Sequence, residues 1–200
     1  LAVSVHGMKR GGLRPGETVA ILGAGNIGLT AVAAARAMGA GRILITARYP
    51  QQADMAHALG ADITVTPEGD TLREALLETT EGRGADLTLE TVGGRTASTL
   101  KQAIDVTRTQ GRIVILGGFH SPITLDWLQP LLNEQSFIFS SCYSVMDGRH
   151  DFELAIGLMS SDQIKLRQMV THEFPLSEIQ CGFNTAYDKT VGSIKVQLHN

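Results

Sequence analysis

A glycine-rich turn near the start of the chain constrains its fold more than any other feature. The turn reads Gly23-Ala24-Gly25-Asn26-Ile27-Gly28, a Gly-x-Gly-x-x-Gly pattern. An apolar run at 18–22 enters it, and an alanine-rich helical pattern at 27–38 leaves it and stops at Gly39. A strand, a glycine turn and a helix in this order bring free backbone N–H groups and the positive end of a helix to one point. The turn therefore predicts a binding site for the pyrophosphate of a dinucleotide.

The residues of this turn have separate roles in such a site. Gly23 permits the sharp bend, Gly25 allows a pyrophosphate to approach the backbone, and Gly28 lets the helix pack closely on the strand. Asn26 and Ile27 complete the turn and are candidate cofactor contacts. A plain strand–turn–helix without a ligand is the alternative interpretation.

Short apolar runs alternate with helical patterns through the first two thirds of the chain. The runs are rich in aliphatic and β-branched residues without polar alternation, which is typical of strands buried on both faces. We expect strands at 18–22, 42–46, 62–65, 87–90, 113–116 and 137–139, and helices at 27–38, 51–59, 72–79 and 96–104. This alternation predicts an α/β fold, a doubly wound six-stranded parallel Rossmann sheet with helices on both faces.

The pattern changes after residue 142. A helix is expected at 151–159, a short strand at 171–174, a helix at 178–187 with Ser177 as its N-cap, and a half-exposed strand at 193–198. This small α+β annex has too few residues for a core of its own, so it must pack on something else. We therefore expect a dinucleotide-binding unit over 1–142 and a C-terminal segment over 143–200.

The end of the second expected strand indicates which dinucleotide binds. NAD sites usually carry Asp or Glu there to bind the ribose hydroxyls, whereas this chain has Thr46-Ala47-Arg48-Tyr49. Ala47 cannot bind a 2′-hydroxyl, Arg48 can pair with a 2′-phosphate and stack on adenine, and Tyr49 can frame the adenine. These residues favour NADP over NAD. The alternative is that Arg48 is merely solvated and both cofactors bind weakly.

Two further segments follow strands at the expected ligand crevice. Thr91, Val92 and Gly93 follow the fourth strand, and residues 116–119 follow the fifth. Because ligands bind at the carboxyl ends of parallel strands, these segments are expected beside the nicotinamide half of the cofactor. Simple turn chemistry is the alternative for both glycine-containing segments.

Charge and composition narrow the choice of partners. The formal net charge is −3 and no run of Lys or Arg occurs, so neither nucleic acid nor a membrane surface is expected as a partner. The apolar runs are far shorter than the ~20 residues of a membrane span. The two cysteines, Cys142 and Cys181, are far apart, and the six histidines lack metal-ligand spacing, so no metal site is expected on this chain. A reducing cytoplasm fits this cysteine usage.

Several segments together resemble one enzyme family along essentially the whole chain. They are residues 1–6 (Leu-Ala-Val-Ser-Val-His), 10–16, 23–28, 59–62, 171–176 and 192–196. These segments are similar to those of the zinc-containing medium-chain dehydrogenases, and most similar to the sorbitol-like polyol and threonine dehydrogenase branch. The resemblance implies zinc-dependent oxidation of a secondary alcohol or polyol, with hydride passing to the nicotinamide cofactor.

The resemblance also implies where the zinc site would be. Complete members of the family bind catalytic zinc in a GroES-like domain, and the last ligand normally precedes the segment that matches Leu1. The chain is therefore expected to be the cofactor domain plus the C-terminal segment, without catalytic or zinc-binding residues and inactive alone. A stand-alone NAD(P)-binding module without catalysis and a zinc-independent NADP-dependent reductase of the same superfamily are the alternatives.

Carried over residue by residue, the resemblance places Ile27 at the pyrophosphate turn and Ala47 where the ribose-binding Asp usually lies. It places Gln52 where the family often has an Arg near the adenosine. Two backbone segments would line the nicotinamide, formed by Leu116, Gly117 and Gly118 and by Ser141 and Cys142. Related enzymes dimerise by joining two sheets, so the apolar run 137–139 at the sheet edge predicts a homodimer.

Overall fold

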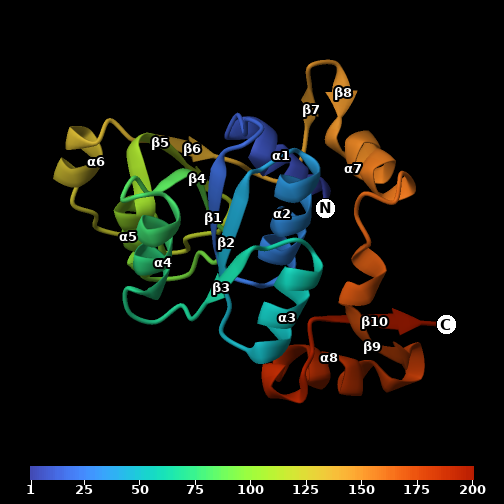
Figure 1. Ribbon diagram of the computed structural model, residues 1–200. Coiled ribbons are helices and arrows are strands. Elements are labelled where there is room, and N and C mark those ends of the chain that lie inside the picture. Colours follow the sequence, from blue (N-terminus) through green and yellow to red (C-terminus); the bar gives the residue numbers. More distant parts are fainter.

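The computed structural model describes residues 1–200 and has a single parallel sheet at its centre (Figure 1). The sheet has six strands in the order β3-β2-β1-β4-β5-β6, and every neighbouring pair is parallel. The strands are β1 (Thr18–Leu22), β2 (Arg42–Thr46), β3 (Ile63–Val65), β4 (Ala85–Glu90), β5 (Thr107–Ile115) and β6 (Ser136–Phe139). The predicted doubly wound sheet is confirmed.

Helices cover both faces of this sheet because alternate strand residues point to opposite sides. The helices of the sheet region are α1 (Ala2–Arg10), α2 (Asn26–Ala37), α3 (Pro50–Ala58), α4 (Thr71–Thr79), α5 (Ser98–Val106) and α6 (Leu128–Leu132). Ile21 packs with α1, α2 and α3 in one buried cluster, whereas the adjacent Leu22 packs with α4 and α5 in a second. The two clusters fix the layers on either side of the strands.

The strand order creates a crevice in the middle of the sheet. From β1 the chain winds outward through β2 to β3, then returns to β4 on the other side of β1 and continues to β6. The connections after β1 and β4 therefore leave in opposite directions. In sheets of this kind, ligands bind at that point, beyond the carboxyl ends of the strands.

The C-terminal segment shares the core of the sheet region. It contains a hairpin of β7 (Val145–Met146) and β8 (Arg149–His150), helix α7 (Asp151–Ser160), strands β9 (Val170–Pro175) and β10 (Lys195–His199), helix α8 (Ile179–Tyr187), and the 3-10 helices η1 (Leu166–Met169), η2 (Leu176–Glu178) and η3 (Lys189–Val191). Strands β9 and β10 form a separate parallel pair. Ile164, Met169 and Ile194 are buried in the cluster that contains Ile21. The segment thus packs on the sheet region, as its small size predicted.

Helix α1 was not expected from the sequence, and its partners explain why it forms. Its Ser4 hydroxyl lies 2.7 Å from that of Thr30 on α2, and His6 Nδ1 lies 2.7 Å from a carboxylate oxygen of Asp151 on α7. All four side chains are buried. Because these partners lie far along the chain, packing rather than local propensity determines the helix.

Asp151 connects α1, α7 and the β7–β8 hairpin. Its carboxylate accepts hydrogen bonds from the Ser144 N–H (2.8 Å) and from Lys9 Nζ (3.2 Å), in addition to its contact with His6. Burial alone raises the pKa of a carboxyl group, but these hydrogen bonds outweigh burial and hold the pKa of Asp151 below its ordinary value. The carboxylate is therefore a charged structural connection.

Two local expectations were wrong or incomplete. Ser177 does not cap α8, because it lies inside η2, and Glu178 occupies the N-cap position without a side-chain hydrogen bond. Strand β5 begins at Thr107, earlier than its apolar run, because its first half pairs with β4 through an irregular register near Gly111. None of the helices combines the length and apolar character needed to cross a membrane.

Candidate cofactor-binding site

Close packing requires glycine at two positions of the turn after β1, Gly23 and Gly28. Gly23 has φ +97, and a Cβ there would lie 2.5 Å from Val92 Cγ2. A Cβ on Gly28 would lie 1.7 Å from the carbonyl oxygen of Gly23. The positive φ and these two close approaches exclude side chains, so the first and last glycines hold α2 against the end of β1.

Gly25 differs because its side-chain direction is open. It is the N-cap of α2, with φ −77, and a Cβ there would meet no atom within 4 Å. No side chain caps this helix, and its first turn contains no acidic residue. The first N–H groups of a helix lack partners within the helix and carry partial positive charge. The open cradle over Gly25 therefore fits a phosphate group.

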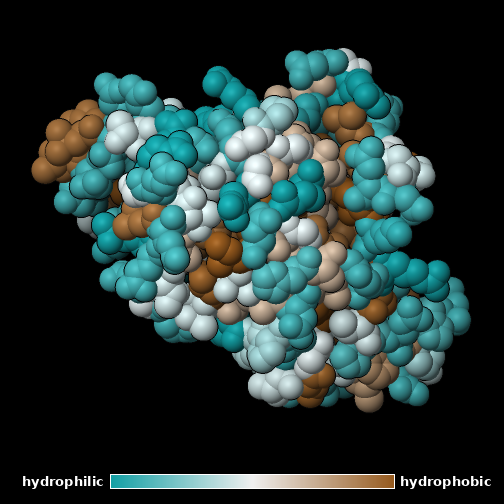
Figure 2. Space-filling view, in the orientation of Figure 1, coloured by the Kyte–Doolittle hydropathy of each residue, from teal (hydrophilic) through white to brown (hydrophobic).

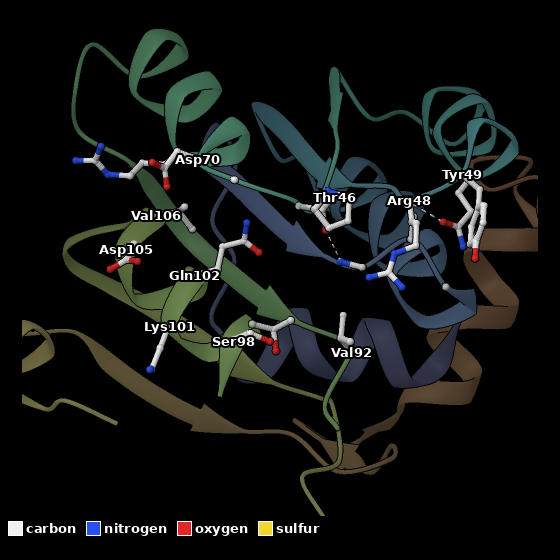
Figure 3. A pocket seen from close by; sticks show the side chains of 18 residues that line it. Thr46, Arg48, Tyr49, Asp70, Val92, Ser98, Lys101, Gln102, Asp105 and Val106 are labelled. Atoms are coloured by element: carbon white, nitrogen blue, oxygen red, sulfur yellow. Dashed lines mark hydrogen bonds between the residues drawn. The ribbon is translucent and has the colours of Figure 1, made fainter. Parts of the chain in front are cut away.

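A cavity of about 500 Å³ opens beside this turn, at the carboxyl ends of β1, β2 and β4 (Figure 3). Its lining combines the glycine turn with the end of β2 and with the facing sides of α4 and α5. The residues are Gly23, Ala24, Gly25, Thr46, Arg48, Tyr49, Gln52, Pro67, Gly69, Asp70, Arg73, Val92, Ser98, Thr99, Lys101, Gln102, Asp105 and Val106. Its volume is in the range of small-molecule and cofactor sites.

The end of β2 presents Arg48 to this cavity. Thr46 fixes the strand end, because its hydroxyl accepts a hydrogen bond from the Gly23 N–H at 2.8 Å. The Arg48 N–H donates to Gln52 Oε1 at 3.2 Å, which positions Gln52 beside the predicted adenosine region. The Arg48 guanidinium is 67% exposed and pairs only with Glu68, at 3.8 Å. It is therefore available to an anion in the cavity.

Ala47 and Tyr49 lie on either side of Arg48 in different surroundings. Ala47 is buried, its N–H donates to the Val65 carbonyl, and its methyl group packs in the core. Ala47 does not line the cavity beside the glycine turn, whereas Tyr49 does. The expected ribose-binding position thus carries no polar group.

The segment after β4 joins the same cavity. The Thr91 hydroxyl donates to the Leu22 carbonyl at 2.7 Å, so it ties this segment to the end of β1. Val92 is 54% exposed and lines the cavity, where Figure 3 shows it below Arg48. The sequence predicted Val92 near the nicotinamide, and in the structure Val92 lines the same cavity as Arg48 and Tyr49.

The segments expected beside the nicotinamide lie outside this cavity. The N–H groups of Leu116 and Gly117 both donate to the Glu90 carbonyl, and the Gly118 carbonyl accepts from the Gly94 N–H. Ser141 and Cys142 follow β6 and are exposed, with Cys142 at φ +55. The structure does not bring these two segments together with Arg48.

A second cavity, of about 570 Å³, lies beside the start of α2. Asn26 and Ile27 line it together with Lys195 of β10 and Arg167 of η1. Both cations come from the C-terminal segment and were missed by the sequence reasoning. For Lys195, the only signal in the sequence was its polar position in the alternating strand at 193–198, which predicts an exposed side chain.

Residues on α4 and α5 were also missed. Ser98, Gln102 and Asp105 recur at helical spacing and line one side of the cavity beside the glycine turn, together with Arg73. The buried Thr99 hydroxyl has no hydrogen-bond partner in the protein. Burial raises the pKa of Asp105, and the nearby Asp70 carboxylate adds to this effect while the Arg73 guanidinium opposes it. This side of the cavity therefore carries both signs of charge.

The donor groups do not fit a zinc ion. No group of three or more His, Cys, Asp or Glu side chains in the structure could hold a metal. His6 is engaged with Asp151, and Cys142 and Cys181 are both free and exposed. No ligand set for a metal is present among residues 1–200, whereas the glycine turn and the cavity beside it fit a phosphate-bearing ligand.

Curated relatives match nearly the whole chain. Sorbitol dehydrogenase of Gallus gallus is 30% identical over 99% of this chain and 54% of its own length. L-threonine 3-dehydrogenase of Bacillus licheniformis is 31% identical over 86% of this chain and 49% of its own length. The chain thus spans about half the length of these relatives.

A solved structure supports the same relationship. The crystal structure of a protein from Sinorhizobium meliloti 1021 bound to NADP superposes with a TM-score of 0.84 and 28% identity, covering 100% of this chain and 57% of that protein. A family model for zinc-binding dehydrogenases matches residues 26–161, which is more than half of the chain. The chain therefore belongs to the zinc-binding dehydrogenase family, as its resemblance predicted.

Proposed function

We propose that this chain is the cofactor-binding part of a zinc-dependent alcohol or polyol dehydrogenase that uses NADP in preference to NAD. One observation carries the preference for NADP. Arg48 presents an exposed guanidinium to the cavity beside the glycine turn, while the adjacent ribose position holds the apolar Ala47. A guanidinium pairs well with a phosphate, and an alanine cannot bind a 2′-hydroxyl.

The residues of this chain bind and orient the cofactor. The open backbone at Gly25 and the first turn of α2 hold the pyrophosphate. Val92, Tyr49 and Arg48 enclose the adenosine, and Arg48 pairs with the 2′-phosphate. Asn26 and Ile27 continue the site toward Lys195, whose ammonium adds positive charge on the second cavity. When bound, the nicotinamide accepts or donates the hydride, which is chemistry of the cofactor.

We infer that the nicotinamide half extends toward the backbone of Leu116, Gly117 and Gly118 and toward Ser141 and Cys142. The hydrogen bonds from this backbone to the Glu90 carbonyl support the inference, because they hold the segment beside the end of β4. Cys142 is assigned as a cofactor neighbour, with no nucleophilic role.

Zinc and the substrate alcohol are assigned to parts of such an enzyme outside these residues. The absence of a ligand set here and the family's zinc-binding character support this assignment. The similarity to sorbitol dehydrogenase supports a polyol or secondary alcohol as the substrate class. The 200 residues by themselves are expected to bind the cofactor without turning over an alcohol, in the cytoplasm.

We also propose a homodimer that forms through the edge strand β6. Phe139 of β6 and Leu131 and Leu132 of α6 are exposed, and Figure 2 shows a hydrophobic patch over α6 at the left edge of the molecule. Trp127 packs on Phe137 at 5.2 Å between ring centroids, so the helix start and the strand form one surface. An unpaired apolar edge favours strand pairing with a second copy.

Fluorescence titration of the purified chain with NADPH and NADH tests the proposal. Wild type is expected to bind NADPH more tightly, and Arg48→Gln is expected to lose most of this difference while NADH binding stays unchanged. Equal affinity for both cofactors in wild type would contradict the assignment of Arg48. A stand-alone binding module would share this result but would never gain activity when joined to a zinc-binding domain.

A further inference from the structure

Glu68 lies beside the guanidinium that the proposed function assigns to the 2′-phosphate. It belongs to the connection between β3 and α4, and its Oε1 is 3.8 Å from Arg48 Nε. The Glu68 side chain is 68% exposed and has no other charged partner. Its neighbours Pro67 and Gly69 line the cavity that contains Arg48. The carboxylate thus stands at the margin of the cofactor cavity.

We propose that Glu68 is a second cofactor-specificity residue, which weakens NADP binding by competing with the 2′-phosphate for Arg48. This inference rests on the proposed function. An Arg–carboxylate pair at 3.8 Å between exposed groups is weak, so it holds the guanidinium without locking it in place. A 2′-phosphate must displace the carboxylate or share Arg48 with it.

The two cofactors respond differently to this carboxylate. A phosphate monoester carries a charge of about −1.5 to −2 at neutral pH, so it is repelled by a carboxylate a few ångströms away. NAD has a hydroxyl at the same position and meets no such repulsion. Glu68 therefore narrows the preference for NADP that Arg48 creates. The chain then discriminates between the cofactors less strongly than Arg48 alone would allow.

The size of the effect follows from the exposure of both groups. Two unit charges about 4 Å apart interact by about 1 kcal/mol at the dielectric constant of water, and physiological salt screens charges over about 8 Å. With up to two charges on the phosphate and a slightly longer separation, removal of the carboxylate should tighten NADPH binding about three- to tenfold at low salt. The gain should shrink at high salt.

The test compares Glu68→Gln with wild type in titrations with NADPH and NADH at low and high ionic strength. Glu68→Gln keeps the side-chain shape and removes the charge. NADPH is expected to bind about three- to tenfold more tightly at low salt and less than about twofold more tightly in 0.5 M salt, while NADH affinity stays the same. Glu78→Gln removes an equal charge from the exposed end of α4, away from the cavity, and should change neither affinity.

Three results would overturn the inference. They are unchanged NADPH affinity in Glu68→Gln, weaker NADPH affinity in that variant, and an equal gain for NADH. If one of these results occurs while Arg48→Gln loses NADPH selectivity, only the role of Glu68 fails and the proposed function stands. If Arg48→Gln binds NADPH as tightly as wild type, the proposed function and the inference fail together. Unchanged thermal unfolding of each variant shows that folding is intact.

Discussion

A methyl group at Gly25 tests whether the cofactor phosphates lie on the glycine turn. Gly25→Ala is compatible with the backbone, because φ is −77 and no atom lies within 4 Å of the new Cβ. The methyl group points into the open cradle that is assigned to the pyrophosphate. The variant should therefore fold as wild type does and bind the cofactor poorly.

The expected loss follows from bond lengths. The new methyl carbon lies about 1.5 Å from the Gly25 Cα, on the side of the phosphate. Without it, the phosphate oxygens can accept hydrogen bonds from backbone N–H groups at N···O distances of about 2.7–3.2 Å. The phosphate must retreat and lose at least one charge-assisted hydrogen bond, worth about 1.5–3 kcal/mol. This corresponds to about ten- to hundredfold weaker binding.

Fluorescence titration with NADPH and thermal unfolding measure the two effects separately. Gly28→Ala is the contrasting variant, because its Cβ would lie 1.7 Å from the Gly23 carbonyl oxygen and would force α2 away from the turn. Overpacking of this kind costs about 1–3 kcal/mol, so this variant should lose several degrees of melting temperature as well as binding. If Gly25→Ala binds NADPH as tightly as wild type, the phosphates do not lie on this turn.

Three further variants test other parts of the structure. Asp151→Asn should lose about 3 kcal/mol of stability at pH 7, because Lys9 and His6 lose their buried carboxylate. Since the folded-state pKa of Asp151 is lowered, its contribution is present above pH ~4 and disappears as the pH falls through the folded-state value, so melting curves of wild type and variant should converge in acid. Asp105 has a raised pKa, so its ionised form opposes folding above pH ~4, and Asp105→Asn should be as stable as wild type or more stable at pH 7 in urea unfolding. Leu131→Lys should give a monomer in light scattering at micromolar concentration, and a dimer that survives this change would locate the interface elsewhere.

The strands of the sheet could be predicted because each of them coincides or overlaps with a short apolar run in the sequence. β1 and β2 match their apolar runs residue for residue, since both are buried on both sides and bounded by turns. Helix α6 was missed because it has only five residues with Pro130 among them, and it is held by packing of Trp127 on β6. Periodicity cannot reveal elements whose stability depends on distant partners.

The sequence predicted the backbone turn of the candidate site, but only some of the side chains that line its cavities. The spacing of Gly23, Gly25 and Gly28 indicates a dinucleotide-binding turn, and the position of Arg48 just after β2 indicates a contact with the ribose end of the cofactor. Arg73, Gln102 and Lys195 belong to no cofactor-binding motif of the sequence. They line the cavities only because α4, α5 and β10 pack beside the glycine turn or the start of α2, and this packing cannot be read from the sequence. The role proposed for Glu68 could not be predicted either, because it depends on the proximity of Arg48, which lies twenty residues earlier in the sequence.

The contact between His6 and Asp151 has a consequence for how the chain unfolds. It joins residues separated by 145 positions, so we expect the contacts of helix α1 with α7 to form only after the chain beyond β6 has folded. A chain shortened at residue 142 would leave Lys9 and His6 facing an empty position and would uncover the face that Ile164 and Met169 protect. We therefore expect residues 1–142 to be less stable without the C-terminal segment, and hydrogen exchange should report α1 and α7 opening together as one cooperative element.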